Sequence, residues 1–324
     1  MNTSSRPGDR STDPWGVLRN FAPPTLLLVL VIVVEVFAPG FATRDTLVIV
    51  LADTAVLFIL ATAETFVILL GGIDLSIQAL ASLASVLLAQ LLPRIGLAAF
   101  PATILAGTLF GFASGVVHVR LKVPSFVATL ATGGVVAGLA LLAAQGRAIT
   151  IEENGRVFTH WINATVLGFP SVIGISLVVG IAAHVGLHYT RFGRYTVAVG
   201  AGEPAAWAAG VNVNRTKIMA FAISGTLASL AGVVLAARLS SGSPTLANQL
   251  MLPAIAAVIV GGTAITGGLG SVGRTAIGAL IISVVRIGMT FIGINIFAEN
   301  IVFGAMLIAA VTITIDRSKI AIIK

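Results

Sequence analysis

The sequence contains no cysteine and has very little charge for its length. Without cysteine, the chain can form neither disulfides nor thiolate metal sites. Only 10% of its 324 residues are charged, whereas soluble domains carry roughly a quarter. So few charged side chains cannot cover the surface of a water-soluble fold of this size. A soluble enzyme or binding domain is therefore excluded, and lipid is the expected solvent for most of the chain.

Apolar residues take the place of the missing charge. They make up 57% of the chain, and the mean hydropathy is +1.06. A helix needs about 20 consecutive apolar residues to cross a bilayer. The sequence predicts an all-α polytopic membrane protein with a single transmembrane domain over residues 22–316 and tails at 1–21 and 317–324. About ten spans are expected, at residues 22–39, 46–70, 75–92, 96–118, 124–145, 170–188, 217–237, 252–266, 275–293 and 299–315.

The net charge of +7 is informative by its position along the chain. Basic residues in short loops favour the cytoplasmic side of a membrane. With the N-terminus inside, 13 of the 19 Lys and Arg residues fall in inner segments. This bias predicts cytoplasmic termini and an even number of crossings. The outer arginines either dock acidic groups of a partner or are neutral to topology; they are Arg44, Arg94, Arg147, Arg156 and Arg238.

The longest inner loop, residues 189–216, contains the stretch "VGAGEPAAWAAGVNV" (199–213). Glu203 and Pro204 suit a first helical turn, because an acid favours the positive helix end and proline tolerates the first position. Ala205 and Ala206 favour helix, and Gly210 suits its end. The loop therefore predicts a short, smooth helix. It either seats in a groove of a partner or anchors the loop at the membrane interface.

A glycine pair and an acid interrupt the apolar run "FVILLGGIDLSIQAL" (66–80). Gly71 and Gly72 loosen the helix and expose backbone groups that need partners. Asp74 is expected to cap the next helix by accepting from the amide of Ser76 or Ile77. The broken segment either only closes this helix end or also lines and gates a pathway, as irregular backbone in membranes often does.

Glu64 lies in the middle of its predicted span, and its own helix offers it no polar neighbour. It must find a partner on another helix or in water. Pathway lining, structural pairing and proton coupling are all open roles for it. Arg286 is the basic residue within a span and is the predicted partner. Glu35 and Asp53 are expected to reach water, and Glu299 to cap the last span.

Five motifs in order resemble the ribose-type branch of the ABC importer permeases, over residues 45–315. They are "GGIDLS" (71–76), "PSFVATLAT" (124–132), "TRFGRYTVAVG" (190–200), "ISGTLASLAGVVLAARL" (223–239) and "IAAVIVGGTAITGGLGSVGRTAIGAL" (255–280). The inner loop resembles the family's coupling segment, whose pattern is Glu-Ala-Ala, three residues, Gly. This chain has Pro204 where the family has the glutamate, and Glu203 one place earlier.

The resemblance implies a bundle like that of the vitamin B12 importer in a bacterial inner membrane. It implies a pentose, hexose or polyol delivered by a secreted binding protein, and a second permease copy or a close relative as partner. ATP and Mg²⁺ would be bound by separate ATPase subunits that contact the segment from Glu203 to Gly210. In agreement, the chain has no Gly-x-x-x-x-Gly-Lys-Ser/Thr phosphate loop.

Two other classes of protein compete with this interpretation. A secondary transporter would couple protons through Glu64, Asp74 and Arg286. A membrane enzyme lacks support, because the sequence shows neither a nucleophilic triad nor paired catalytic carboxylates. "GLGSVG" (268–273) lacks the soluble strand and acid of a dinucleotide site. His184 and His188 lack a third metal ligand nearby.

Overall fold

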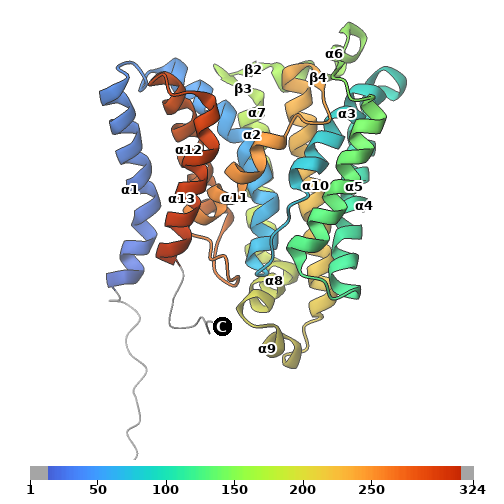
Figure 1. Cartoon of the computed structure of the whole chain (residues 1–324), viewed down its shortest axis with the longest axis vertical. Coiled ribbons are helices and arrows are strands. Elements are labelled where there is room, and N and C mark those ends of the chain that lie inside the picture. Colours follow the sequence, from blue (N-terminus) through green and yellow to red (C-terminus); the bar gives the residue numbers. More distant parts are fainter. Residues whose placement is uncertain (1–13, 315–324) are drawn as a thin grey trace, which may run out of the picture.

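The computed structural model describes residues 14–314, and in that part the chain is a bundle of helices (Figure 1). The predicted tail 317–324 and residues 1–13 of the predicted tail 1–21 lie outside the described residues, whereas residues 14–21 belong to α1 rather than to a tail. The longer helices are α1 (Pro14–Phe37), α2 (Arg44–Leu69), α3 (Ile77–Ile95), α4 (Ala99–Arg120), α5 (Ser125–Ala144), α7 (Ser171–Tyr189), α10 (Val213–Leu239), α12 (Val272–Phe291) and α13 (Glu299–Thr314). The shorter ones are α6 (Glu153–Asn163), α8 (Arg191–Ala201), α9 (Glu203–Ala208) and α11 (Met251–Val260).

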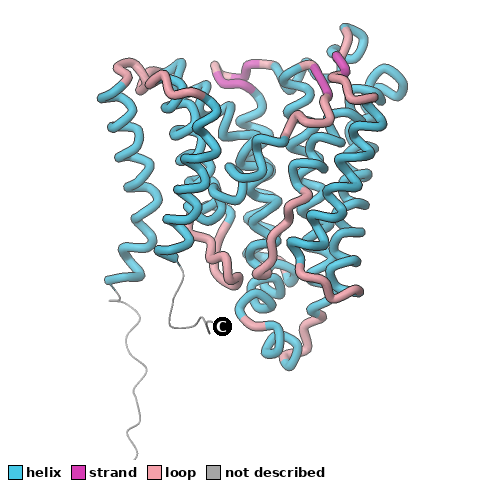
Figure 2. Tube along the Cα trace, viewed as in Figure 1, coloured by secondary structure: helices cyan, strands magenta, loops and turns pink. Residues whose placement is uncertain are grey.

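Strands are confined to four two-residue pieces. β1 (Ile149–Thr150) pairs with β4 (Ser241–Gly242), and β2 (Thr165–Val166) pairs with β3 (Phe169–Pro170), both antiparallel. They lie with α6 at one end of the bundle, and α8 and α9 lie at the opposite end (Figure 1). Figure 2 shows that loops gather at these two ends, except for two non-helical segments that enter the bundle.

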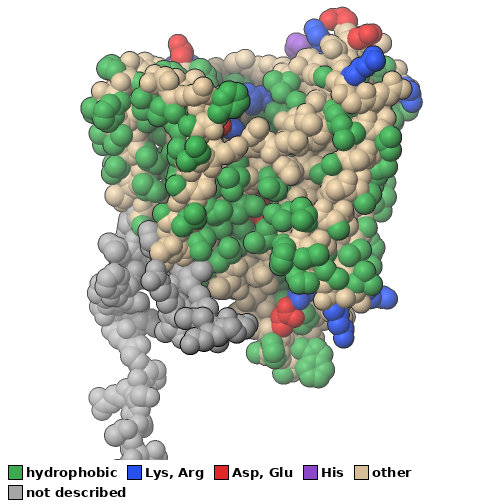
Figure 3. Space-filling view, in the orientation of Figure 1, with side chains coloured by type: hydrophobic (Ala, Val, Ile, Leu, Met, Phe, Trp, Pro, Cys, Tyr) green, Lys and Arg blue, Asp and Glu red, His purple; other side chains and the backbone are tan. Residues whose placement is uncertain are grey.

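Six helical stretches of the described chain are long and apolar enough to cross a membrane. One of them, Ile77–Arg120, contains both α3 and α4, which are separated by a turn at Gly96. On the face shown in Figure 3, charged side chains gather at the two ends and apolar side chains cover much of the belt between them. This distribution is the one expected of a polytopic membrane protein.

Helix α2 forms the centre of the bundle. Every residue from 54 to 70 is buried, and α2 packs against α7, α10, α11 and α12. A helix that is apolar on all sides and buried on all sides lies inside a bundle rather than at its surface. The residues that interrupt this helix at its end are therefore placed in the interior of the protein.

Glycines at every fourth position of α4, Gly107, Gly111 and Gly115, bring α4 and α10 into direct backbone contact. A Cβ atom on Gly111 would lie 2.3 Å from the carbonyl oxygen of Phe221 and 2.9 Å from the Cα of Gly225. Small residues at this spacing allow helix backbones to approach closely in membranes. On α5, by contrast, Gly134 and Gly138 face open space, so the same residue type there only fills the helix surface.

The predicted span 252–266 is wrong as a continuous helix. Helix α11 ends at Val260, and the chain then turns through Gly262, Gly267 and Gly268 before α12 begins. These glycines have φ values of +97°, +86° and +75°. Such backbone is disfavoured for residues that carry a Cβ, so the helix cannot continue through them. The other nine predicted spans coincide with helices to within a few residues, except α1, which begins earlier.

We expect Gly111→Ala to force α4 and α10 apart and to cost about 1–3 kcal/mol of stability, as overpacking of a close contact does. Gly134→Ala on α5 is the matched control, because its new methyl group meets no neighbour within 4 Å. Thermal unfolding of both variants in detergent measures the effect. An equal melting temperature for the two variants would contradict the assigned α4–α10 contact.

Candidate translocation and coupling site

Two fully buried carboxylates, Glu64 and Asp74, lie together at the centre of the protein. The amide of Asp74 donates to Glu64 Oε1 at 3.1 Å. Asp74 Oδ1 accepts from the amide and hydroxyl of Ser76 at 2.9 and 2.5 Å, and its Oδ2 accepts from the hydroxyl of Ser224 on α10 at 2.7 Å. The predicted bond from the Ser76 amide to Asp74 is confirmed, but the N-cap residue of α3 is Ser76 rather than Asp74, and α3 has no side-chain cap. Asp74 therefore ties the start of α3 to α10.

The predicted pairing of Glu64 with Arg286 is wrong. Arg286 forms an ion pair with Asp53, which lies 11 residues before Glu64 on the same helix. At 1.5 Å per residue this separation is about 16 Å along α2, too far for one side chain to serve both acids. Asp53 is therefore an ion-pair partner rather than a water-exposed acid. Glu35 accepts from the amides of Gly40 and Ala42.

The broken segment, defined here as residues 71–76, is held by side chains of its neighbours. The amide of Ile73 donates to Ser125 Oγ at 3.1 Å, and that of Leu75 donates to Thr129 Oγ1 at 3.0 Å. Both acceptors lie on α5. Together with Glu64 they satisfy three successive amides that no helix satisfies. Non-helical backbone is tolerated at membrane depth only where protein or water supplies such partners.

Four glycines meet where the broken segment begins. They form the glycine junction, which consists of Gly71, Gly200, Gly267 and Gly268. The amide of Gly268 donates to the carbonyl of Leu69 at 2.9 Å. A Cβ on Gly200 would lie only 1.8 Å from that carbonyl oxygen, and one on Gly267 would lie 2.7 Å from the amide nitrogen of Gly71. The junction therefore joins α8, the end of α2 and the 261–271 loop through bare backbone.

The predicted inner-loop helix is confirmed as α9, and Gly210 stops it. The amides of Gly210 and Val211 donate to the carbonyls of Trp207 and Ala206 at 2.9 and 3.0 Å, and Gly210 has φ +82°. This is the Schellman arrangement that glycine favours after a helix. Helix α8, which precedes α9 and brings Gly200 to the junction, was not predicted.

The surface of α9 differs from the smooth alanine face expected from the sequence. Ala206 points inward and is only 4% exposed, whereas Trp207 is 75% exposed. Pro204, Ala205 and Ala208 are also exposed. Glu203 is not a free acid, because it forms an ion pair with Lys217 at the start of α10. The face open to a partner therefore centres on Trp207 and excludes Ala206.

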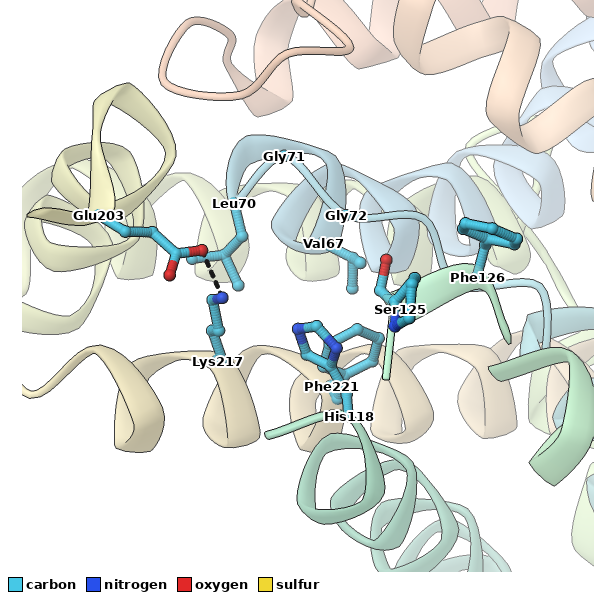
Figure 4. A pocket seen from close by; sticks show the side chains of 11 residues that line it. Val67, Leu70, Gly71, Gly72, His118, Ser125, Phe126, Glu203, Lys217 and Phe221 are labelled. Atoms are coloured by element: carbon cyan, nitrogen blue, oxygen red, sulfur yellow. Dashed lines mark ion pairs between the residues drawn. The ribbon is translucent and has the colours of Figure 1, made fainter. Parts of the chain in front are cut away.

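A cavity of about 330 Å³ lies between α9 and the broken segment (Figure 4). Its wall contains the Glu203–Lys217 pair on one side and Gly72 and Ser125 on the other, with His118 between them. His118 Nδ1 lies 2.6 Å from the carbonyl oxygen of Val123. Sequence reasoning missed Lys217, His118 and Ser125 as cavity residues, because the wall that they share is built from segments distant in the chain.

The remaining candidates do not form sites. The rings of His184 and His188 stack on each other, and the described residues contain no group of three His, Asp or Glu side chains placed to hold a metal. The "GLGSVG" run packs against α8 rather than opening a dinucleotide turn, since Gly268 contacts Ala201. Arg238 donates to the carbonyl of Ala52 at 2.8 Å, so it is not a free docking arginine.

A buried broken segment, a second helix interruption at 261–271 and an exposed short helix linked to both through α8 are features expected of a multi-pass transport permease. Comparison with known proteins supports this class. The family model described as "Branched-chain amino acid transport system / permease component" matches residues 46–311. The chain is 38% identical over 290 residues to the ribose import permease protein RbsC of Haemophilus influenzae, covering 88% of this chain and 90% of the relative.

Two further relatives extend the likeness. RbsC of Bacillus subtilis is 37% identical over 310 residues, covering 94% of this chain and 95% of the relative. The L-arabinose transport system permease protein AraH of Escherichia coli is 34% identical over 315 residues, covering 96% and 92%. The chain therefore belongs to this family of ABC importer permeases and is a multi-pass protein of the inner membrane.

We expect Gly200→Ala to reduce solute uptake at least tenfold, because the new methyl group displaces α8 from the carbonyl of Leu69. Gly202→Ala is the matched control two residues away, where a Cβ meets nothing within 4 Å. Uptake is normalised to the amount of each variant in the membrane fraction. Equal uptake by both variants would show that the glycine junction is not needed for transport.

Proposed function

We propose that the chain is the membrane permease of an ATP-driven importer of a sugar-like solute. The solute class is a pentose, hexose or polyol, delivered by a secreted binding protein. The relatives named for ribose and arabinose import support a sugar, since each matches this chain over nearly its whole length. The family description mentions branched-chain amino acids, but the named relatives at 34–38% identity are sugar permeases.

The proposal includes ten membrane crossings with both ends of the chain in the cytoplasm. α1 begins and α13 ends at the end of the bundle that carries α8 and α9 (Figure 1). The exposed basic residues near this end include Arg120, Lys122, Arg191, Arg194 and Arg215. Short loops rich in Lys and Arg favour the cytoplasmic side. Helix α11 has only 10 residues, so its crossing would be completed by the non-helical segment at 261–271.

The single observation that carries the mechanism is the direct backbone contact between α8 and the two helix interruptions. In the proposed mechanism, ATPase subunits that bind ATP and Mg²⁺ grip α9 by its exposed Trp207 face. Movement of α9 and α8 passes through Gly200 to Leu69 and Gly268. The broken segment and the 261–271 loop then shift together. A second permease copy would complete the pathway, so that solute entering from outside is released beside the cavity of Figure 4.

Proton-coupled secondary transport is the alternative function. The second oxygen of Glu64, Oε2, has no hydrogen-bond partner among the described residues although it is buried. An acid in this position is the kind of group that carries protons in membrane transporters. The first oxygen of Glu64, however, already accepts from the broken segment, which gives this acid a structural role that needs no proton transfer.

We expect Ala205→Arg and Ala208→Arg to abolish uptake, because each adds bulk and charge to the exposed face of α9 without entering the bundle. Asn154→Arg is the control, since it adds the same group at an exposed position of α6, at the opposite end of the bundle. Uptake of radiolabelled ribose or arabinose, with co-purification of the ATPase, gives the readout. Retained uptake and retained ATPase in both α9 variants would refute the coupling role.

Glu64→Gln separates the two functions. Its amide oxygen still accepts from the Asp74 amide, so an ATP-driven permease keeps its uptake to within about threefold. Glu64→Ala leaves that amide unpaired, at a typical cost of about 1–3 kcal/mol, and we expect it to lower both stability and uptake. Loss of uptake in Glu64→Gln, together with collapse of wild-type uptake by a protonophore at constant ATP, would favour the proton-coupled alternative.

A further inference from the structure

An apolar groove of about 260 Å³ opens on the outer surface of the bundle, between α7 and α10. Phe66 of α2, which is 3% exposed, contributes to it from the core of the bundle. Val179, Ala183 and Gly186 line it from α7, and Ile223 and Leu227 from α10. All of the lining residues are apolar. The groove therefore offers no hydrogen-bonding side chain to a sugar and is not expected to be part of a sugar pathway.

Phe192, at the start of α8, lines the groove at the end that is cytoplasmic in the proposed orientation. The rings of Phe66 and Phe192 contact each other, with their centroids 6.1 Å apart. Just beyond, Tyr189 is 73% exposed and Tyr195 is 40% exposed. Exposed tyrosines mark the level of lipid headgroups in membrane proteins. The groove therefore lies at acyl-chain depth in the cytoplasmic leaflet.

Basic residues lie close to this end in the sequence. Arg191 and Arg194 flank Phe192 in sequence and are exposed, as is His188 at the end of α7. The neighbouring turn from Tyr189 to Tyr195 contains no acidic residue to neutralise them. Basic pockets between transmembrane helices on the cytoplasmic side attract anionic lipid headgroups. An apolar slot with adjacent positive charge is complementary to a phospholipid that has one chain in the slot and an anionic headgroup at its mouth.

We propose that this groove binds one anionic phospholipid of the cytoplasmic leaflet. One acyl chain occupies the groove between α7 and α10, and the headgroup phosphate lies at Arg191 and Arg194. The bound lipid contacts the Phe66–Phe192 pair, so it stabilises α8 against α2. Because α8 also carries Gly200 to the glycine junction, the lipid acts on the element that links the inner loop to the helix interruptions.

The test uses native mass spectrometry of the purified full chain in micelles with equal amounts of phosphatidylglycerol and phosphatidylcholine of matched acyl chains. We expect the wild type to retain one phosphatidylglycerol in preference to phosphatidylcholine. Gly186→Leu fills the groove, since a Cβ there meets nothing within 4 Å, and should lower retention at least tenfold. Ala182 of α7 also lines the groove, so Ala182→Phe fills it from a second position and should have the same effect.

Gly174→Leu is the matched control, because it makes the same change on an exposed part of α7 away from the groove. It should retain lipid like the wild type. Arg191→Gln with Arg194→Gln should keep a lipid but lose its headgroup preference, by about fivefold per arginine. The proposal is overturned if both groove-filling variants retain phosphatidylglycerol like Gly174→Leu, if the wild type shows no headgroup preference, or if free glycerol phosphate displaces the lipid.

Discussion

The structure depends on how residues 71–76 satisfy their backbone inside the membrane. Three successive amides of this non-helical segment donate to Ser125, Glu64 and Thr129, and Asp74 fixes the same segment to α10 through Ser224. A buried polar group lowers the stability of the protein when it has no hydrogen-bond partner, and it fixes the position of its neighbours when it has one. The two buried acids, Glu64 and Asp74, therefore have a structural role. They accept hydrogen bonds from amides that lose their helical acceptors where the helix is interrupted at Gly71 and Gly72.

The glycine junction connects the broken segment to two other parts of the protein, helix α8 and the 261–271 loop. Helix α8, the end of α2 and the 261–271 loop contact one another with no side chain between their backbones at Gly200. Close-packed interfaces transmit displacement because they cannot deform continuously. The exposed helix α9 follows α8 directly, so a force on its Trp207 face reaches both interruptions by a short path. Helix α8 also contributes Phe192 to the proposed lipid groove. A lipid bound there would contact the helix that links α9 to the two interruptions.

Much of the fold was predictable from the sequence, because apolar runs of about 20 residues and the glycine at position 210 act locally. The interruption at Gly71–Gly72 and the bond from the Ser76 amide to Asp74 were predictable for the same reason. The partners of Glu64 and Arg286 were not, since α2 carries three acids, Asp45, Asp53 and Glu64, and only the packing of α12 decides which one Arg286 meets. The role of Gly200 could not be predicted either, because the need for a glycine can be recognised only once the backbone packed against it is known. The burial of Ala206 and the exposure of Trp207 could likewise not be predicted without knowing how α9 is oriented against the bundle.

The central claim is that nucleotide-driven movement of α9 reaches residues 71–76 through the glycine junction. The natural absence of cysteine allows a direct measurement: Ile73→Cys is introduced as a single thiol, and its labelling rate by a water-soluble thiol reagent is followed in the assembled transporter. The account predicts that the rate differs between nucleotide-free and ATP-trapped states, and that this difference disappears when Gly200→Ala is added. A rate that is the same in both nucleotide states, or a difference that persists in the Gly200→Ala background, would contradict it.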